Sequence, residues 1–246
     1  MRQEEQSPPE HNHELLSQHF KEQEEVMQKI YRTGARSYFE SLPDLVKAFS
    51  PHDRWIRCID DRTPGGYHSA GSGILRKEEE VLASFRAAQV QGITSHDGCG
   101  AAAMYAQKNS LTSNPDEYGK RWSEQIAGKL GVPYKHIEIS KPHNARICYY
   151  DGTRRFNFSN VDSLLPGFIV SRRIQDSATS INEAEITANI ALGDHGFGKL
   201  ITEDRPFVVV AIGQSEKELE EFKKELTPTL SNFGNKVKID GFVAPK

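Results

Sequence analysis

Between residues 55 and 108 the chain alternates twice between a short apolar run and a stretch with helical periodicity. The runs at 55–59 and 93–96 are bounded by turn-forming residues, which is typical of strands. Helical spacing follows each run, over 78–91 and over 100–108. Strand, helix, strand, helix in this order indicates parallel strands joined by right-handed crossovers. We therefore predict an α/β fold with a central, mainly parallel sheet flanked by helices.

The same pattern continues towards the C-terminus, although the sequence contains no internal repeat. An amphipathic, highly charged segment predicts a helix over 215–226. Apolar segments predict further strands, at 136–140, 146–150, 168–171 and 207–212.

The chain divides into three parts. Residues 1–13 include Pro8 and Pro9 among mostly charged and polar side chains, and we expect this lead-in to be disordered. Apolar positions at helical spacing predict an N-terminal helical arm over 14–50. Residues 51–246 form the α/β domain, which contains every candidate metal-binding and catalytic residue.

Composition and charge narrow the classes of partner. The formal net charge is −3 with both signs interspersed, so no basic surplus is available for nucleic-acid phosphates. No run reaches the roughly 18 apolar residues of a membrane helix, and the polar N-terminus has no signal-peptide core. Three cysteines in such a chain favour free thiols over disulfides. We expect a cytoplasmic protein that acts on a small molecule, with neither a nucleic acid nor a membrane as partner.

Two motifs lie at the predicted strand ends. Cys58 ends the first strand, and His96 and Cys99 follow the second. Because α/β sheets bind ligands outside the carboxyl ends of their strands, these side chains can converge. Two thiolates and an imidazole are a three-ligand zinc set that leaves a fourth tetrahedral position open. The same donors suit cadmium or cobalt. The alternative to a metal site is two core cysteines and a hydrogen-bonded histidine.

Asp60 and Arg62 accompany the first motif. In an extended chain they lie on the same side as Cys58. A carboxylate beside a metal needs a partner, and a guanidinium offers a planar two-point fork. The pair is therefore a candidate catalytic dyad that orients a metal-bound hydroxide, or Asp60 itself takes the fourth metal position. A structural ion pair at the strand end is the non-catalytic alternative.

Two further residues are weaker candidates. His68 follows the first motif in the glycine-rich stretch 63–73, which we expect to wall the substrate pocket. We predict a solvated loop histidine, with a proton shuttle at the rim of the pocket as the alternative. Cys148 has no histidine near it in the sequence, and we predict a core thiol.

The order C-x-D-x-R and then H-x-x-C-G resembles the signature of β-class carbonic anhydrases. The resemblance covers about residues 53–108. In that family the two cysteines and the histidine bind zinc, and the Asp–Arg dyad holds the nucleophilic hydroxide. The Pro-Gly-Gly after the first motif is similar to the ζ-class, cadmium-tolerant enzymes of diatoms. The segment between the motifs is shorter than in the β-class.

The resemblance implies a zinc-dependent lyase that hydrates carbon dioxide reversibly to bicarbonate. It also implies a homodimer in which the N-terminal helical arm wraps around a partner. Two alternatives stay open. The same site would hydrolyse carbonyl sulfide or carbon disulfide, or it would bind metal without catalysis and serve a regulatory role.

Overall fold

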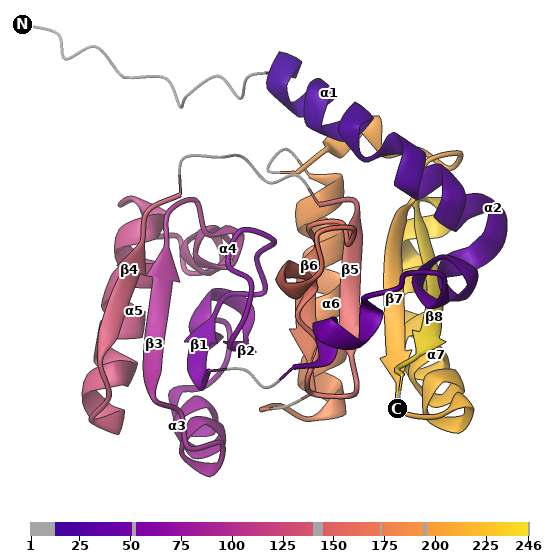
Figure 1. Ribbon diagram of the computed structural model, residues 1–246. Coiled ribbons are helices and arrows are strands. Elements are labelled where there is room, and N and C mark those ends of the chain that lie inside the picture. Colours follow the sequence, from indigo (N-terminus) through magenta and orange to yellow (C-terminus); the bar gives the residue numbers. More distant parts are fainter. Residues whose placement is uncertain (1–12, 51–52, 140–144, 173, 194–195, 246) are drawn as a thin grey trace, which may run out of the picture.

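A computed structural model describes residues 13–50, 53–139, 145–172, 174–193 and 196–245 (Figure 1). It confirms the predicted α/β fold, because parallel strands alternate with helices along the described chain. The helices are α1 (His13–Glu22), α2 (Glu24–Glu40), α3 (Glu78–Ala87), α4 (Gly100–Lys108), α5 (Pro115–Leu130), α6 (Ser177–Leu192) and α7 (Glu216–Leu230). The strands are β1 (Trp55–Arg57), β2 (Tyr67–His68), β3 (Gly92–His96), β4 (Tyr134–Ile137), β5 (Ile147–Asp151), β6 (Phe168–Ser171), β7 (Phe207–Gly213) and β8 (Val237–Val243).

In the described residues the strands form two four-stranded parallel sheets that share one topology. The first sheet has the order β2-β1-β3-β4 and the second has the order β6-β5-β7-β8. In each sheet the second strand lies on one side of the first strand and the third strand lies on the other. A backbone hydrogen bond of 3.0 Å from Ile169 N–H to the Ile59 carbonyl joins the two sheets. Figure 1 shows the two sheets side by side.

The apolar core crosses the junction between the sheets. One buried cluster contains Cys58 and Cys99 from the first sheet's side together with Cys148 and Phe168 from the second. Burial of all seven residues of β7 explains its uninterrupted apolar sequence, since a central parallel strand is covered on both faces. Cys148 is fully buried in β5, so the predicted core thiol is confirmed.

The N-terminal helices pack on the second sheet of their own chain. In Figure 1, α2 lies over β7 and β8, and the ring of Phe39 stacks on Phe242 at 4.7 Å. A short 3-10 helix, η1 (Leu45–Phe49), ends this part of the chain. The helical arm predicted for residues 14–50 therefore exists, and the homodimer through it stays a prediction. Apart from His13, the predicted disordered lead-in lies outside the described residues.

Several elements differ from the sequence predictions. Helices α5 and α6 and strands β2 and β8 were not predicted. Strand β4 begins two residues before the predicted strand, whose last residue is outside the described part. Helix α7 extends four residues beyond its predicted end. Among the described residues, no helix combines the length and the apolar character that crossing a membrane requires.

A buried arginine connects the arm to the start of β5. The side chain of Arg146 is fully buried, and its guanidinium carbon lies 3.7 Å from the centre of the Phe20 ring. It donates hydrogen bonds to the Glu24 carboxylate at 2.7 Å and to the Tyr31 hydroxyl at 3.2 Å. These contacts explain why the arm is fixed to the sheet.

We expect Arg146→Met to lower the free energy of unfolding by about 2–3 kcal/mol. The substitution leaves Glu24 without its closest partner, and the partial exposure of Glu24 keeps the cost below that of a fully buried pair. Urea denaturation followed by circular dichroism measures the change. Arg205→Met is the matched control, because Arg205 is half exposed and 3.9 Å from the same carboxylate. Equal shifts in the two variants would contradict this interpretation.

Candidate metal centre

The topology of the first sheet brings the two sequence motifs together. Strands β2 and β3 lie on opposite sides of β1, and such a switch in strand order is where open α/β sheets bind ligands, outside the carboxyl ends of their strands. Cys58 directly follows β1, and His96 is the last residue of β3. Cys99 is the N-cap residue of α4. The convergence predicted for Cys58, His96 and Cys99 is therefore confirmed.

The three side chains form a compact, buried cluster. One sulfur or nitrogen atom from each residue lies within 4.8 Å of those from the other two. The Cys58 and Cys99 sulfurs are 3.9 Å apart, and both cysteines are free thiols. Two sulfurs at about 2.3 Å from a tetrahedral zinc ion lie about 3.8 Å apart. The separation therefore fits two ligands of one metal ion.

The orientation of His96 also fits a ligand. Its Nδ1 atom lies 2.9 Å from the Asp97 carbonyl oxygen, which fixes the ring and assigns the ring proton to Nδ1. Its buried Nε2 atom makes no hydrogen bond with any described residue. The lone pair of a neutral imidazole is then available at Nε2, as in metal sites where the other ring nitrogen binds a carbonyl.

Protons and metal ions compete for these atoms. The hydrogen bond shared with the Cys99 sulfur, together with burial, raises the pKa of the Cys58 thiol well above its usual value. Burial lowers the pKa of His96, but the neighbouring Cys58 sulfur, the Asp60 carboxylate and the bond to the Asp97 carbonyl together outweigh it and raise this pKa to about 9. A metal ion binds thiolate and neutral imidazole, so binding must release protons.

We expect metal affinity to rise with pH. Because its pKa is raised, the Cys58 thiol stays protonated between pH 6 and 8, and binding releases at least one proton in this window. Each released proton changes affinity about tenfold per pH unit, so binding at pH 8 should be at least about a hundredfold tighter than at pH 6. Competition with a chromophoric chelator at both pH values, corrected for protonation of the chelator, measures the ratio. A ratio near one would exclude the thiol as a ligand.

Asp60 and Arg62 form a fork beside the cluster. Arg62 donates from Nε to Asp60 Oδ1 at 2.8 Å and from Nη2 to Oδ2 at 2.9 Å, and its backbone N–H also bonds Oδ1 at 2.9 Å. The Asp60 side chain is 2% exposed, and its Oδ2 lies 3.6 Å from His96 Nε2. Arg62 Nη2 also bonds the Gly98 carbonyl at 3.2 Å. The pair is therefore held against both motifs.

Asp116, a residue that the sequence prediction did not include, supports the second motif. Its carboxylate accepts hydrogen bonds from the Gly98 N–H at 3.0 Å and the Cys99 N–H at 3.3 Å. Asp116 therefore satisfies two backbone amides of the turn that leads into α4 and carries Cys99. The sequence signal was the Asn-Pro-Asp start of α5, where Asn114 caps the helix.

The glycine-rich stretch lies against the cluster. After β2 the chain forms a short 3-10 helix, η2 (Ala70–Gly73), which is buried throughout. The Gly71 N–H donates to the Cys58 sulfur at 3.2 Å, and a side chain at Gly71 would collide with Ile74. The prediction of a solvated His68 is wrong. This residue is 1% exposed in β2, and its Nδ1 lies 2.7 Å from the Cys58 carbonyl oxygen.

Comparisons with known proteins leave the site to be interpreted from its own chemistry. The chain matches no protein-family model, no curated protein and no solved structure. The parallel α/β sheet and the Cys-His-Cys cluster are compatible with a β-class carbonic anhydrase. The functional interpretation therefore depends on which reaction this cluster and the adjoining Asp–Arg pair can support.

Proposed function

We propose that the chain is a metal-dependent, carbonic anhydrase-like lyase that hydrates carbon dioxide reversibly to bicarbonate. The observation that carries the proposal is the position of a buried Asp60 carboxylate, held by the Arg62 fork, beside the Cys58–His96–Cys99 cluster. A cluster of three ligands alone would suit a structural metal site equally well. The adjoining carboxylate supplies the acceptor that a hydrolytic or hydrating reaction needs.

The donor set favours zinc. Two thiolates neutralise a divalent cation, and three protein ligands leave one tetrahedral position for water. Zinc bound there would supply Lewis-acid activation of water near neutral pH. The same donors would also hold cadmium or cobalt. Cys58, His96 and Cys99 are the proposed ligands.

Asp60 acts in this proposal as an oriented acceptor and not as a fourth ligand. Both of its oxygens already accept hydrogen bonds from Arg62, so the carboxylate is held in place. The three-residue cluster does not extend to an Asp60 oxygen. We expect Asp60 to accept a hydrogen bond from the attacking water, which directs the oxygen lone pair towards carbon dioxide.

Metal analysis combined with stopped-flow carbon dioxide hydration tests the proposal. We expect about one zinc per chain and a hydration rate that rises between about pH 6 and 9, because two thiolates donate more charge than neutral ligands and disfavour ionisation of water. Protein stripped by a chelator is the control. Bound metal without hydration at any pH would reject the proposal and favour a regulatory metal site. Faster turnover of carbonyl sulfide or carbon disulfide would reassign the substrate.

Two further parts of the interpretation stay predictions. A homodimer through the helical arm predicts twice the chain mass in light scattering. A cytoplasmic location predicts that the tagged, full-length chain fractionates with soluble cytoplasmic markers.

A further inference from the structure

Glu183 is a buried carboxylate outside the catalytic assignment. It lies on α6, in the second half of the chain, and is 2% exposed. One oxygen accepts from the Ala70 N–H at 2.7 Å and from the Ser69 hydroxyl at 2.9 Å. The other accepts from Gln175 Nε2 at 2.6 Å. A buried carboxylate with three donors is a fixed point in the structure.

Ser69 and Ala70, which bond Glu183, directly precede the residue that contacts the cluster. Ala70 precedes Gly71, whose N–H donates to the Cys58 sulfur at 3.2 Å. The backbone at Gly71 and at Ser72 is left-handed, with φ of 52° and 54°. Such a conformation is costly for serine and persists only where surrounding contacts impose it. Glu183 supplies two of these contacts to the stretch 69–73.

Hydrogen bonds at Ser72 also fix the end of the stretch 69–73. The Ser72 hydroxyl donates to the Thr94 carbonyl at 2.6 Å, and Trp122 Nε1 donates to the Ser72 carbonyl at 3.1 Å. These bonds connect the stretch to β3 and α5. The two bonds of Glu183 to Ser69 and Ala70 connect the same stretch to α6.

We propose that Glu183 is a positioning residue of the metal centre, which aims the Gly71 N–H at the Cys58 sulfur through its bonds to Ser69 and Ala70. This inference rests on the proposed metal centre. The Gly71 N–H holds the Cys58 sulfur in place and stabilises the negative charge of a metal-binding thiolate, so losing this hydrogen bond should weaken metal binding. The same bond withdraws electron density from the sulfur, so its loss should also shift sulfur-to-metal charge-transfer bands to longer wavelength. Partners of ligands that lie one contact away typically change metal affinity tenfold to a hundredfold.

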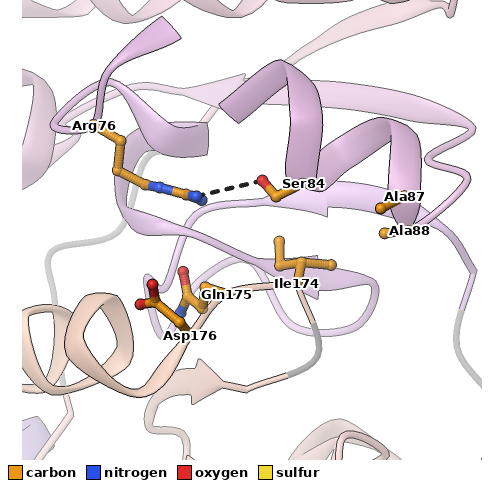
Figure 2. A pocket seen from close by; sticks show the side chains of 7 residues that line it. All are labelled: Arg76, Ser84, Ala87, Ala88, Ile174, Gln175 and Asp176. Atoms are coloured by element: carbon orange, nitrogen blue, oxygen red, sulfur yellow. Dashed lines mark hydrogen bonds between the residues drawn. The ribbon is translucent and has the colours of Figure 1, made fainter. Parts of the chain in front are cut away.

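Gln175 connects this arrangement to the surface. It lines a pocket of about 390 Å³ next to Asp176 and opposite Arg76 and Ser84. Figure 2 shows Gln175 just before the start of α6. The residue is half-buried. The buried Gln175 Oε1 has no hydrogen-bond partner among the described residues. A substitution here therefore removes one bond to Glu183 with little risk to the fold.

Cobalt titration of the apoprotein tests the role of Glu183, because cobalt–thiolate charge-transfer bands report electron donation by sulfur. We expect Glu183→Ala to weaken cobalt binding about tenfold, the lower end of the range for direct partners because Glu183 acts through Gly71, and to shift the charge-transfer band to longer wavelength. Glu183→Gln should stay within about threefold of wild type. Its amide oxygen can accept from Ser69 and Ala70, and its amide nitrogen can donate to Gln175 Oε1 after rotation of the Gln175 amide.

Thr187→Ala is the matched control. Thr187 is buried one turn further along α6, and its hydroxyl donates to the Ala184 carbonyl within the helix. The same band position and affinity in Glu183→Ala and Thr187→Ala would overturn the inference. Gln175→Ala should shift the band in the same direction with a smaller loss of affinity, and it decides the outcome if Glu183→Ala does not fold. Wild type that binds no cobalt would reject the metal centre and this inference with it, whereas binding unaffected by Glu183 rejects the inference alone.

Discussion

Replacing Cys99 with serine is expected to remove the metal from the purified protein. A serine hydroxyl is a far weaker ligand than a thiolate at neutral pH, and only Cys58 and His96 would remain. We expect metal affinity to fall by more than about a hundredfold, since changes one contact further away already cost tenfold to a hundredfold. Metal content by mass spectrometry after gel filtration measures the loss. It should fall from about one ion per chain to a small fraction of that.

Cys148→Ser is the control for the loss of metal. It makes the same chemical change at another fully buried cysteine, in β5, which is not part of the cluster. We expect this variant to keep its metal, because its sulfur contributes no ligand. Metal retained in Cys99→Ser, or lost equally in both variants, would show that the cluster does not bind it.

Asp60→Asn is expected to keep the metal and to lose activity. In asparagine an NH2 donor replaces one of the two acceptor oxygens. This NH2 group then faces either the water or one of the two N–H donors of Arg62. The water acceptor is then lost from its position beside the cluster. Groups of this kind contribute about a hundredfold to ten-thousandfold, so we expect carbon dioxide hydration to fall by at least about a hundredfold. Stopped-flow rates normalised to metal content measure the effect.

Asp53→Asn is the control for the loss of activity. Asp53 pairs with Arg57 at 2.8 Å, so it is another Asp–Arg pair on the same segment of chain, and it is half exposed. We expect its hydration rate to stay within about threefold of wild type. Loss of metal in Asp60→Asn would instead identify Asp60 as a ligand and favour the closed, non-catalytic site.

The cluster could be predicted because each ligand adjoins a strand end. Cys58 follows an apolar run, and His96 ends another, so a parallel sheet brings them to the same edge. This inference needs only local patterns and one topological rule. The burial of His68 could not be predicted in this way. The glycine-rich sequence around it is typical of an exposed loop, whereas the pairing of β2 with β1 and the contact with the Cys58 carbonyl place His68 in the interior.

The missed helices had different causes. Helix α6 is buried on most faces, and its buried residues include Ser180, Glu183 and Thr187, so no amphipathic period marks it. Helix α5 has a clear start at Asn114 and Pro115 and a left-handed Gly131 at its end. Its sequence therefore carries the usual signals of a helix start and a helix end, although the prediction missed it. The contacts of Glu183 with Ser69 and Ala70 span more than a hundred residues, and no local pattern contains them. The matching order of strands in the two sheets is also invisible in the sequence.

The hydrogen bond between Ile169 and Ile59 joins the second half of the chain to the segment that carries Cys58, so both halves contribute to the surroundings of the metal centre. A fragment that ended before residue 145 would contain all three candidate ligands and would still lose their cover. Helix α6 would be missing, and with it Ile190, whose side chain packs where Gly100 leaves room. The contact surface between the two sheets, with their helices, therefore lies next to the metal centre. Dissecting this protein into separately expressed halves would divide the part of the molecule that most needs to stay intact.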